Sequence, residues 1–197
     1  MQIPVMQRKD IIMKEKISTK SSKILADFLN KNELHKKDFA QMIGVTLSYV
    51  YNLIDNTIPF STRGTTLERI ATVMEVAPET FEEYRLPQEP IIIDESVNKI
   101  KTALKSKKMK TVDFLKSFPR NKRLDIVDML RGALPVPLDY SELNFTGNII
   151  GLSQTDIFNI WEARFKQVLE SGGMNIYSNS ELINKMLDCA KKYIISK

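Results

Sequence analysis

Cysteine and histidine are almost absent from this sequence of 197 residues, which holds one of each, Cys189 and His35. A single cysteine excludes an internal disulfide framework and a cysteine-based zinc cluster, and a single histidine without such partners is insufficient for a metal site. We therefore expect neither a metal nor any other cofactor. Cys189 lies among apolar residues at helical spacing, which predicts a buried, inert thiol rather than a redox-active one.

Glycine and proline are also scarce, at 7 and 8 residues, whereas an all-β fold needs many turns. No apolar run approaches the roughly 18–20 residues that cross a bilayer, and residues 1–22 lack the continuous apolar segment of a signal peptide. We therefore expect a soluble, cytoplasmic protein with no membrane partner. Paired acid–base residues, a metal-ligand cluster and a glycine-rich phosphate loop are missing too, so we do not expect an enzyme.

Helical periodicity, by contrast, dominates from about Lys20 onward. Apolar residues make up 43% of the chain, enough for a core, and the net charge of +5 is compatible with nucleic acid without establishing it. The pattern predicts an all-α protein with five parts: an N-terminal extension (1–19), a first domain of five short helices (20–86), a proline-containing linker (87–95), a second helical domain (96–170) and a C-terminal helix (171–197).

The stretch LHKKDFAQMIGVTLSYVYNLIDN, residues 34–56, predicts two short helices joined by a tight turn. Ala40 allows the two helices to cross closely, and Gly44 adopts the left-handed conformation that the turn needs. Thr46 is a typical N-cap for the second helix, Leu47–Ile54. This arrangement holds the second helix clear of the surface, where it is narrow enough to enter a DNA major groove.

The motif resembles the phage-repressor-like helix-turn-helix family, also called the Cro/CI or XRE family, and the resemblance covers about residues 20–86. It rests on these positions: Phe39, Ala40, Gly44, Val45, Thr46, Val50, Leu53, Thr65, Thr66, Leu67, Ile70, Ala71, Val76, Ala77 and Pro78. The resemblance implies a lambda-repressor-like five-helix DNA-binding domain in a transcriptional regulator, usually a repressor that dimerises. Ile54 replaces a frequent glutamate and Asn56 a frequent glycine, although asparagine also tolerates the left-handed cap.

Four residues face outward from the second helix because Val50 and Leu53 point inward: Leu47, Ser48, Tyr51 and Asn52. The resemblance implies that these four residues contact base edges in the major groove. Asn52 has the amide geometry that recognises adenine, and Leu47 fits a thymine methyl group. The alternative is that Leu47 and Tyr51 form an apolar surface that binds another protein.

Contacts with the DNA backbone are implied by the resemblance for Lys36 and Lys37 at the start of the first helix, for Thr46, and for Arg63 in the loop after the recognition helix. Lys36 stands where the family often has glutamine, so a base contact is not expected of it. The alternative is that Lys36 and Lys37 are ordinary solvated charges.

The second half repeats the first weakly, which predicts a degenerate second copy of the domain. Matching pairs occur at a shift of 75 residues that becomes 76 after the turn: Asp38-Phe39 with Asp113-Phe114, and Pro59 with Pro135. The counterpart of the recognition helix spans Asn121–Arg131. Leu124 and Val127 occupy outward positions there, which indicates self-association or packing on the first copy. Asp125 and Asp128 would face phosphates unfavourably.

Residues 99–123 nevertheless carry ten basic side chains and one acidic side chain. The candidate secondary basic patch comprises Lys105, Lys107, Lys108, Lys110, Lys122 and Arg123. It either lies on the DNA backbone without recognising sequence or forms a solvated face.

These patterns favour a sequence-specific regulator of transcription that binds double-stranded DNA as a homodimer. Two amphipathic C-terminal helices, about Ser153–Glu170 and Ser180–Ile195, are the expected dimer surface. A monomer with two DNA-binding units is the alternative assembly. The alternative function is a helical adaptor that binds protein, such as an antitoxin or the partner of a regulator, with weak affinity for DNA.

Overall fold

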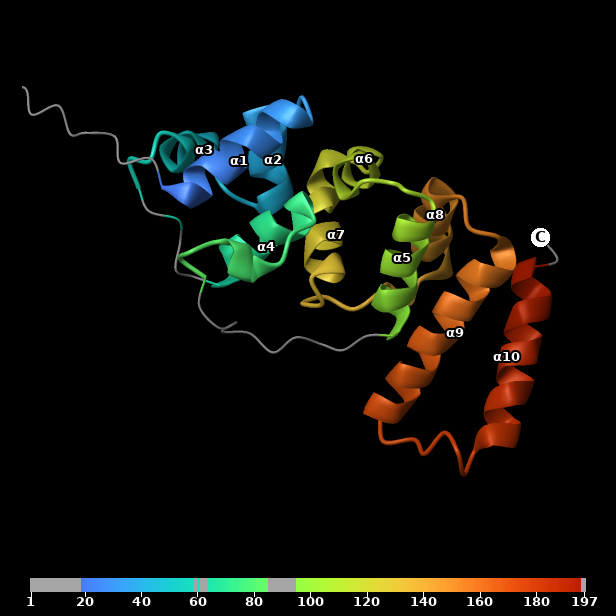
Figure 1. Cartoon of the computed structure of the whole chain (residues 1–197). Helices are drawn as coiled ribbons and strands as arrows, with labels where there is room; N and C mark the ends of the chain where they lie inside the picture. Colours follow the sequence, from blue (N-terminus) through green and yellow to red (C-terminus); the bar gives the residue numbers. More distant parts are fainter. Residues whose placement is uncertain (1–18, 59, 61–63, 85–94, 196–197) are drawn as a thin grey trace, which may run out of the picture.

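The computed structural model describes residues 19–58, 60, 64–84 and 95–195, and all regular structure within them is helical (Figure 1). The predicted all-α class is therefore confirmed. In chain order the elements are α1 (Lys20–Lys31), α2 (Lys36–Ile43), α3 (Leu47–Ile54), α4 (Gly64–Met74), the 3-10 helix η1 (Pro78–Thr80), α5 (Glu95–Ser106), α6 (Thr111–Lys116), the 3-10 helix η2 (Arg120–Lys122), α7 (Arg123–Leu130), α8 (Tyr140–Ile150), α9 (Gln154–Ser171) and α10 (Ser180–Ile195).

Some expected features lie outside the described residues: positions 1–18 of the N-terminal extension, Pro59, Arg63 and positions 87–94 of the linker. None of the described helices combines the length and the apolar character that crossing a membrane requires.

Local signals in the sequence explain where the helices of the first half begin and end. Gly44 ends α2 with a φ of 71°, in the left-handed region that favours glycine. Thr46 caps α3, because its side-chain oxygen accepts a hydrogen bond from the backbone N–H of Tyr49. Asn56 has a φ of 54° just after α3, as its turn propensity predicts. The expected fifth helix at Pro78 is a short 3-10 helix.

Helix α3 is fixed from beneath by α1 and by the core. Val50 and Leu53 are fully buried, and so is Leu25 of α1. The hydroxyl of Ser22 in α1 donates a buried hydrogen bond to the backbone carbonyl of Leu53, at 2.8 Å. The same carbonyl, in the last turn of α3, also accepts a hydrogen bond from the backbone N–H of Asn56, at 3.3 Å. The position of α3 is therefore set by both apolar packing and a directional contact.

The helix boundaries of the second half repeat those of the first. Helices α5 and α6 begin 75 residues after α1 and α2, and α7 and α8 begin 76 residues after α3 and α4. The extra residue falls at Pro119, where η2 takes the place of the turn between α2 and α3. Helix α7 also contacts α5 and α6, as α3 contacts α1 and α2.

Helix α7 lies at the centre of the molecule, between the first half and the rest of the second (Figure 1). It packs on α2 and α4, and residues 126–130 are all buried. The expected outward positions are therefore covered. Val127 has no exposed surface, and the half-buried Leu124 lies against Gly44. Of the two sequence alternatives, packing on the first half is the one observed.

Helices α9 and α10 form a hairpin at the end of the chain (Figure 1). A capping box between Ser153 and Asp156 begins α9. In α10, Ile183 and Leu187 are buried, whereas Cys189 is exposed. The prediction of a buried thiol is wrong, because Cys189 follows Leu187 by two positions. That spacing points its side chain away from the i, i+4 row that packs inward.

We predict that Gly44→Ala destabilises the chain for two reasons. A left-handed conformation costs alanine about 1–2 kcal/mol, and the added Cβ would lie 2.9 Å from both Cδ atoms of Leu124. Leu124→Ala removes this steric contact. The double variant therefore loses about 0.5–1 kcal/mol less stability than the sum of the losses in the two single variants. Urea denaturation of the four proteins measures this coupling. Strictly additive losses would show that this turn does not touch α7 in solution.

Candidate nucleic-acid interface

The outward face of α3 carries the side chains that the sequence predicts there. Leu47, Ser48, Tyr51 and Asn52 are all exposed, with 39% of Leu47 and 46% of Tyr51 accessible. Leu47 and Tyr51 thus place two part-exposed apolar side chains on one face of a short helix. Ser48 and Asn52 add hydroxyl and amide groups that donate and accept hydrogen bonds.

The N-terminus of α2 lies beside this face. The ammonium Nζ of Lys36 is 4.9 Å from the centre of the Tyr51 ring, which is cation–π geometry. Lys37 is exposed next to it, and His35 occupies the N-cap without a side-chain hydrogen bond to the helix. The free N–H groups of a helix N-terminus attract anions. Positive charge thus borders the outward face of α3.

The structure adds one cation from the second half, Arg120 of η2. A shallow cavity of about 470 Å³ brings Arg120 together with Lys36, Lys37, Leu47 and Tyr51. The Arg120 side chain is 61% exposed, and one of its nitrogens lies 3.5 Å from the carboxylate of Asp38. In the sequence, Arg120 was one member of a long basic run. Its place beside α3 follows from the packing of α7 on α2, which no local pattern indicates.

The residues of the candidate secondary basic patch lie in different surroundings and have different partners. Lys105, Lys108 and Lys110 line one cavity, and Lys110 also donates to the Asn32 side chain at 3.1 Å. Lys122 pairs with Glu142 at 3.3 Å. The Arg123 side chain is only 11% exposed and donates to the carbonyl of Phe118. These residues therefore do not present one continuous set of free cations to a DNA backbone.

The recognition positions of α3 have counterparts in α7, and the counterparts are used for internal contacts. At the shift of 76 residues, Ser48, Tyr51 and Asn52 correspond to Leu124, Val127 and Asp128. Leu124 touches the α2–α3 turn and Val127 is fully buried. The same face of the two helices thus points outward in α3 and toward the first half in α7.

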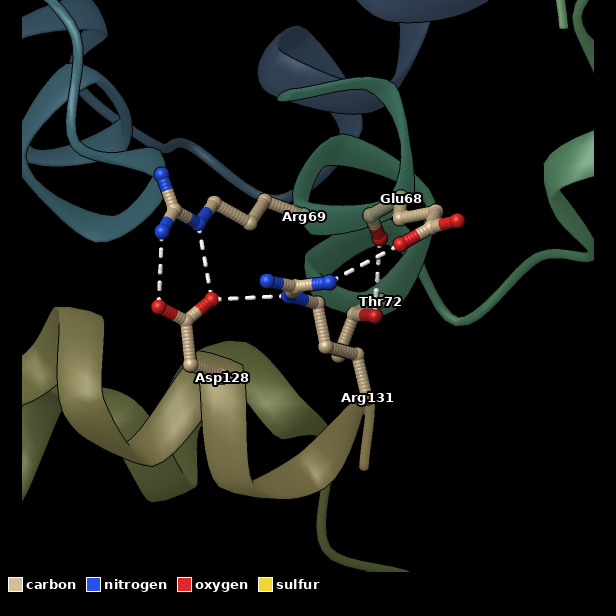
Figure 2. Close-up of polar contacts among 5 residues, drawn as sticks. All are labelled: Glu68, Arg69, Thr72, Asp128 and Arg131. Atoms are coloured by element: carbon tan, nitrogen blue, oxygen red, sulfur yellow. Dashed lines mark hydrogen bonds and ion pairs between the residues drawn. The ribbon is translucent and has the colours of Figure 1, made fainter. Parts of the chain in front are cut away.

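Asp128 is the polar centre of that contact (Figure 2). Arg69 of α4 donates two hydrogen bonds to its two oxygens, each at 2.7 Å, and Arg131 donates a third at 2.8 Å. Arg131 also bridges to Glu68 of α4, at 2.9 Å. Burial raises the pKa of the Asp128 carboxyl, but the hydrogen bonds from Arg69 and Arg131 lower it by more, so the pKa lies below its ordinary value.

The described part of the chain contains no group of three or more histidine, cysteine, aspartate or glutamate side chains that could hold a metal ion. Comparison with known proteins finds no family model, no curated protein and no solved structure that matches the chain. Its function is therefore inferred from its own residues.

We predict that Asp128→Asn lowers the free energy of unfolding at neutral pH by about 3–5 kcal/mol, because it leaves the Arg69 guanidinium without a carboxylate and Arg131 with Glu68 alone. The stabilisation from Asp128 is present above its unfolded pKa and is lost as pH falls below about 4 toward the lower folded pKa. Denaturation at several pH values therefore shows a steeper acid loss in the wild type than in the variant. Asp125→Asn, at an exposed position in the first turn of α7, is the matched control and costs at most about 1 kcal/mol, from its interaction with the helix dipole. Equal effects of the two substitutions would contradict this role of Asp128.

Proposed function

We propose that this chain is a sequence-specific, double-stranded DNA-binding regulator of transcription, a repressor of the Cro/CI type with α3 as its recognition helix. The observation that carries the proposal is the outward face of α3. It presents Leu47, Ser48, Tyr51 and Asn52 on a helix that α1 and the core hold in position, and cations lie at one edge of this face. The order of α1 to α4 and η1, with Gly44 at the turn, supports a lambda-repressor-like domain.

In this proposal the contacts with DNA divide into two kinds. Asn52 hydrogen-bonds an adenine edge, and Leu47 packs on a thymine methyl group. Lys36, Lys37 and Arg120 hold a phosphate beside the N-terminus of α2, where Asp38 neutralises only part of their charge. The exposed hydroxyl of Thr46 already accepts a hydrogen bond from Tyr49 and retains its proton for a phosphate oxygen. Arg63 lies outside the described residues.

Each chain offers one recognition helix in this proposal, because α7 is occupied by internal contacts. Recognition of two successive major grooves then requires a second copy of the chain. We place the dimer surface on the C-terminal hairpin, where Leu182, Met186 and Tyr193 of α10 are 53%, 43% and 66% exposed. A row of exposed apolar side chains on a helix that packs only part of its circumference supports this choice.

A second candidate function is that of a protein-binding adaptor, as in an antitoxin or the partner of a regulator. The exposed Leu47 and Tyr51 favour it, because aromatic and apolar side chains are the usual anchors of protein interfaces. In this case α3 contacts another protein, and binding to duplex DNA is weak and vanishes near physiological salt.

Selection from random duplex DNA by the full-length protein at physiological salt tests the proposed function. An enriched inverted repeat, with half-site centres about 34 Å apart, supports a two-fold DNA-binding regulator. A single asymmetric site supports DNA binding but contradicts the dimer. No enrichment by the folded protein contradicts the proposal and favours the adaptor.

We predict that Asn52→Ala costs about 1–3 kcal/mol of binding free energy on the selected site and relaxes the preference at one base pair. Its affinity for random duplexes stays unchanged, because Asn52 is assigned no phosphate contact. Asn148→Ala, at an exposed position of α8, is the control and leaves both affinities as they are. Equal losses on selected and random DNA would remove Asn52 from sequence recognition.

We predict that Arg120→Ala and Lys36→Ala each weaken binding to all duplexes and lower the salt dependence, with the slope of log affinity against log salt falling by about one for each contact. The exposed Lys192 of α10 provides a control, Lys192→Ala, with the same change of charge. Titrations at several salt concentrations measure the slopes. If Arg120→Ala behaves like Lys192→Ala, the second half contributes no phosphate contact.

A further inference from the structure

A cavity of about 640 Å³ lies between α4 of the first half and α5 of the second, on residues that the DNA proposal does not use. Its volume falls within the range of small-molecule sites, about 300–1,000 Å³. One wall comes from Glu68 and Thr72 of α4, and the opposite wall from α5 and the residues that follow it. Leu130 and Arg131 at the end of α7 also line it. The cavity therefore exists only because the two halves pack together.

Three lysines on the α5 side have no partner for their charge. Lys101, Lys105 and Lys108 form no ion pair and no side-chain hydrogen bond within the described residues, whereas Lys110 beside them donates to Asn32. The pKa of Lys101 lies below its ordinary value because its surroundings desolvate the ammonium group and because Lys105 repels it. An anion bound beside Lys101 would offset both the desolvation of its ammonium group and the repulsion from Lys105. The α5 wall thus has the properties of an anion site.

The α4 side of the cavity has acidic rather than basic surroundings. Burial, followed by the carboxylates of Glu68 and Glu79, raises the pKa of Tyr84, which also lines the cavity. One oxygen of Glu68 accepts from Arg131, while the other points away from Arg131, is buried and accepts no hydrogen bond (Figure 2). These carboxylates repel a negative group, so this wall of the cavity favours the uncharged part of a ligand.

Glu75 and Thr111 also line the cavity, where the Glu75 carboxylate accepts a hydrogen bond from the backbone N–H of Thr111. The rest of the lining is apolar: Ala71, Val76, Pro78, Leu104, Met109 and Leu130. A ligand that fills such a site buries an apolar body between two polar ends. We propose that this cavity binds a small organic anion whose negative group meets Lys101, Lys105 and Lys108 and whose apolar body packs against the α4 wall. Because Glu68 and Arg131 belong to the contact between α4 and α7, the bound anion strengthens the packing of the two halves.

Anilinonaphthalene sulfonate is a suitable probe, since it combines a sulfonate with an aromatic body. In a fluorescence titration of the full chain we expect a saturable site whose affinity falls about tenfold or more in Lys101→Ala/Lys105→Ala. The matched control is Lys107→Ala/Lys116→Ala, with the same change of charge at exposed positions. This control keeps the wild-type affinity.

The neutral analogue phenylnaphthylamine lacks the sulfonate, and we expect it to bind the wild type and both double variants equally. If the two double variants bind the sulfonate probe alike, or if the neutral analogue loses as much affinity as the probe in Lys101→Ala/Lys105→Ala, the proposal is wrong. Circular dichroism checks that the variants remain folded, as expected for exposed lysines. The result is independent of DNA binding, because no residue of α3 lines this cavity.

Discussion

The buried carboxylate of Asp128 is the contact on which the rest of the arrangement depends. It receives three hydrogen bonds from Arg69 and Arg131, and Arg131 extends the network to Glu68. A buried charge is tolerated only when such partners compensate its lost hydration, so these four groups fix how α7 meets α4. The same packing sets Arg120 beside the outward face of α3 and closes the cavity between α4 and α5.

The two halves use equivalent helices for different purposes. In α3 the outward positions hold Ser48, Tyr51 and Asn52, and they remain exposed. Their counterparts in α7 make the contact with the first half, so α7 cannot enter a groove while the halves are packed. On the proposed function, a monomer that used α7 as a second recognition helix would need the two halves to separate. The proposed regulator has one recognition helix per chain, held in place by the packing of the second half on the first.

Local signals made much of the fold predictable. Gly44, Thr46 and Asn56 have the backbone conformations or hydrogen bonds that their side chains favour, and the apolar period placed α3 and α10 at their observed bounds. The exposed face of α3 followed from the inward Val50 and Leu53. Contacts between distant segments were not predictable. Nothing near Asp128 in the sequence indicates Arg69, and an isolated helix pattern does not show that Cys189 misses the single row of α10 that packs on α9.

Oxidative footprinting of side chains, with the duplex obtained by selection, tests the central claim that α3 and not α7 meets DNA. Tyr51 is 46% exposed, whereas its counterpart in α7, Val127, has no exposed surface. The account predicts that hydroxyl radicals modify Tyr51 in the free protein, that the duplex protects it, and that Val127 stays unreactive throughout. An unprotected Tyr51, or a Val127 that reacts in the free protein and becomes protected by DNA, would contradict it.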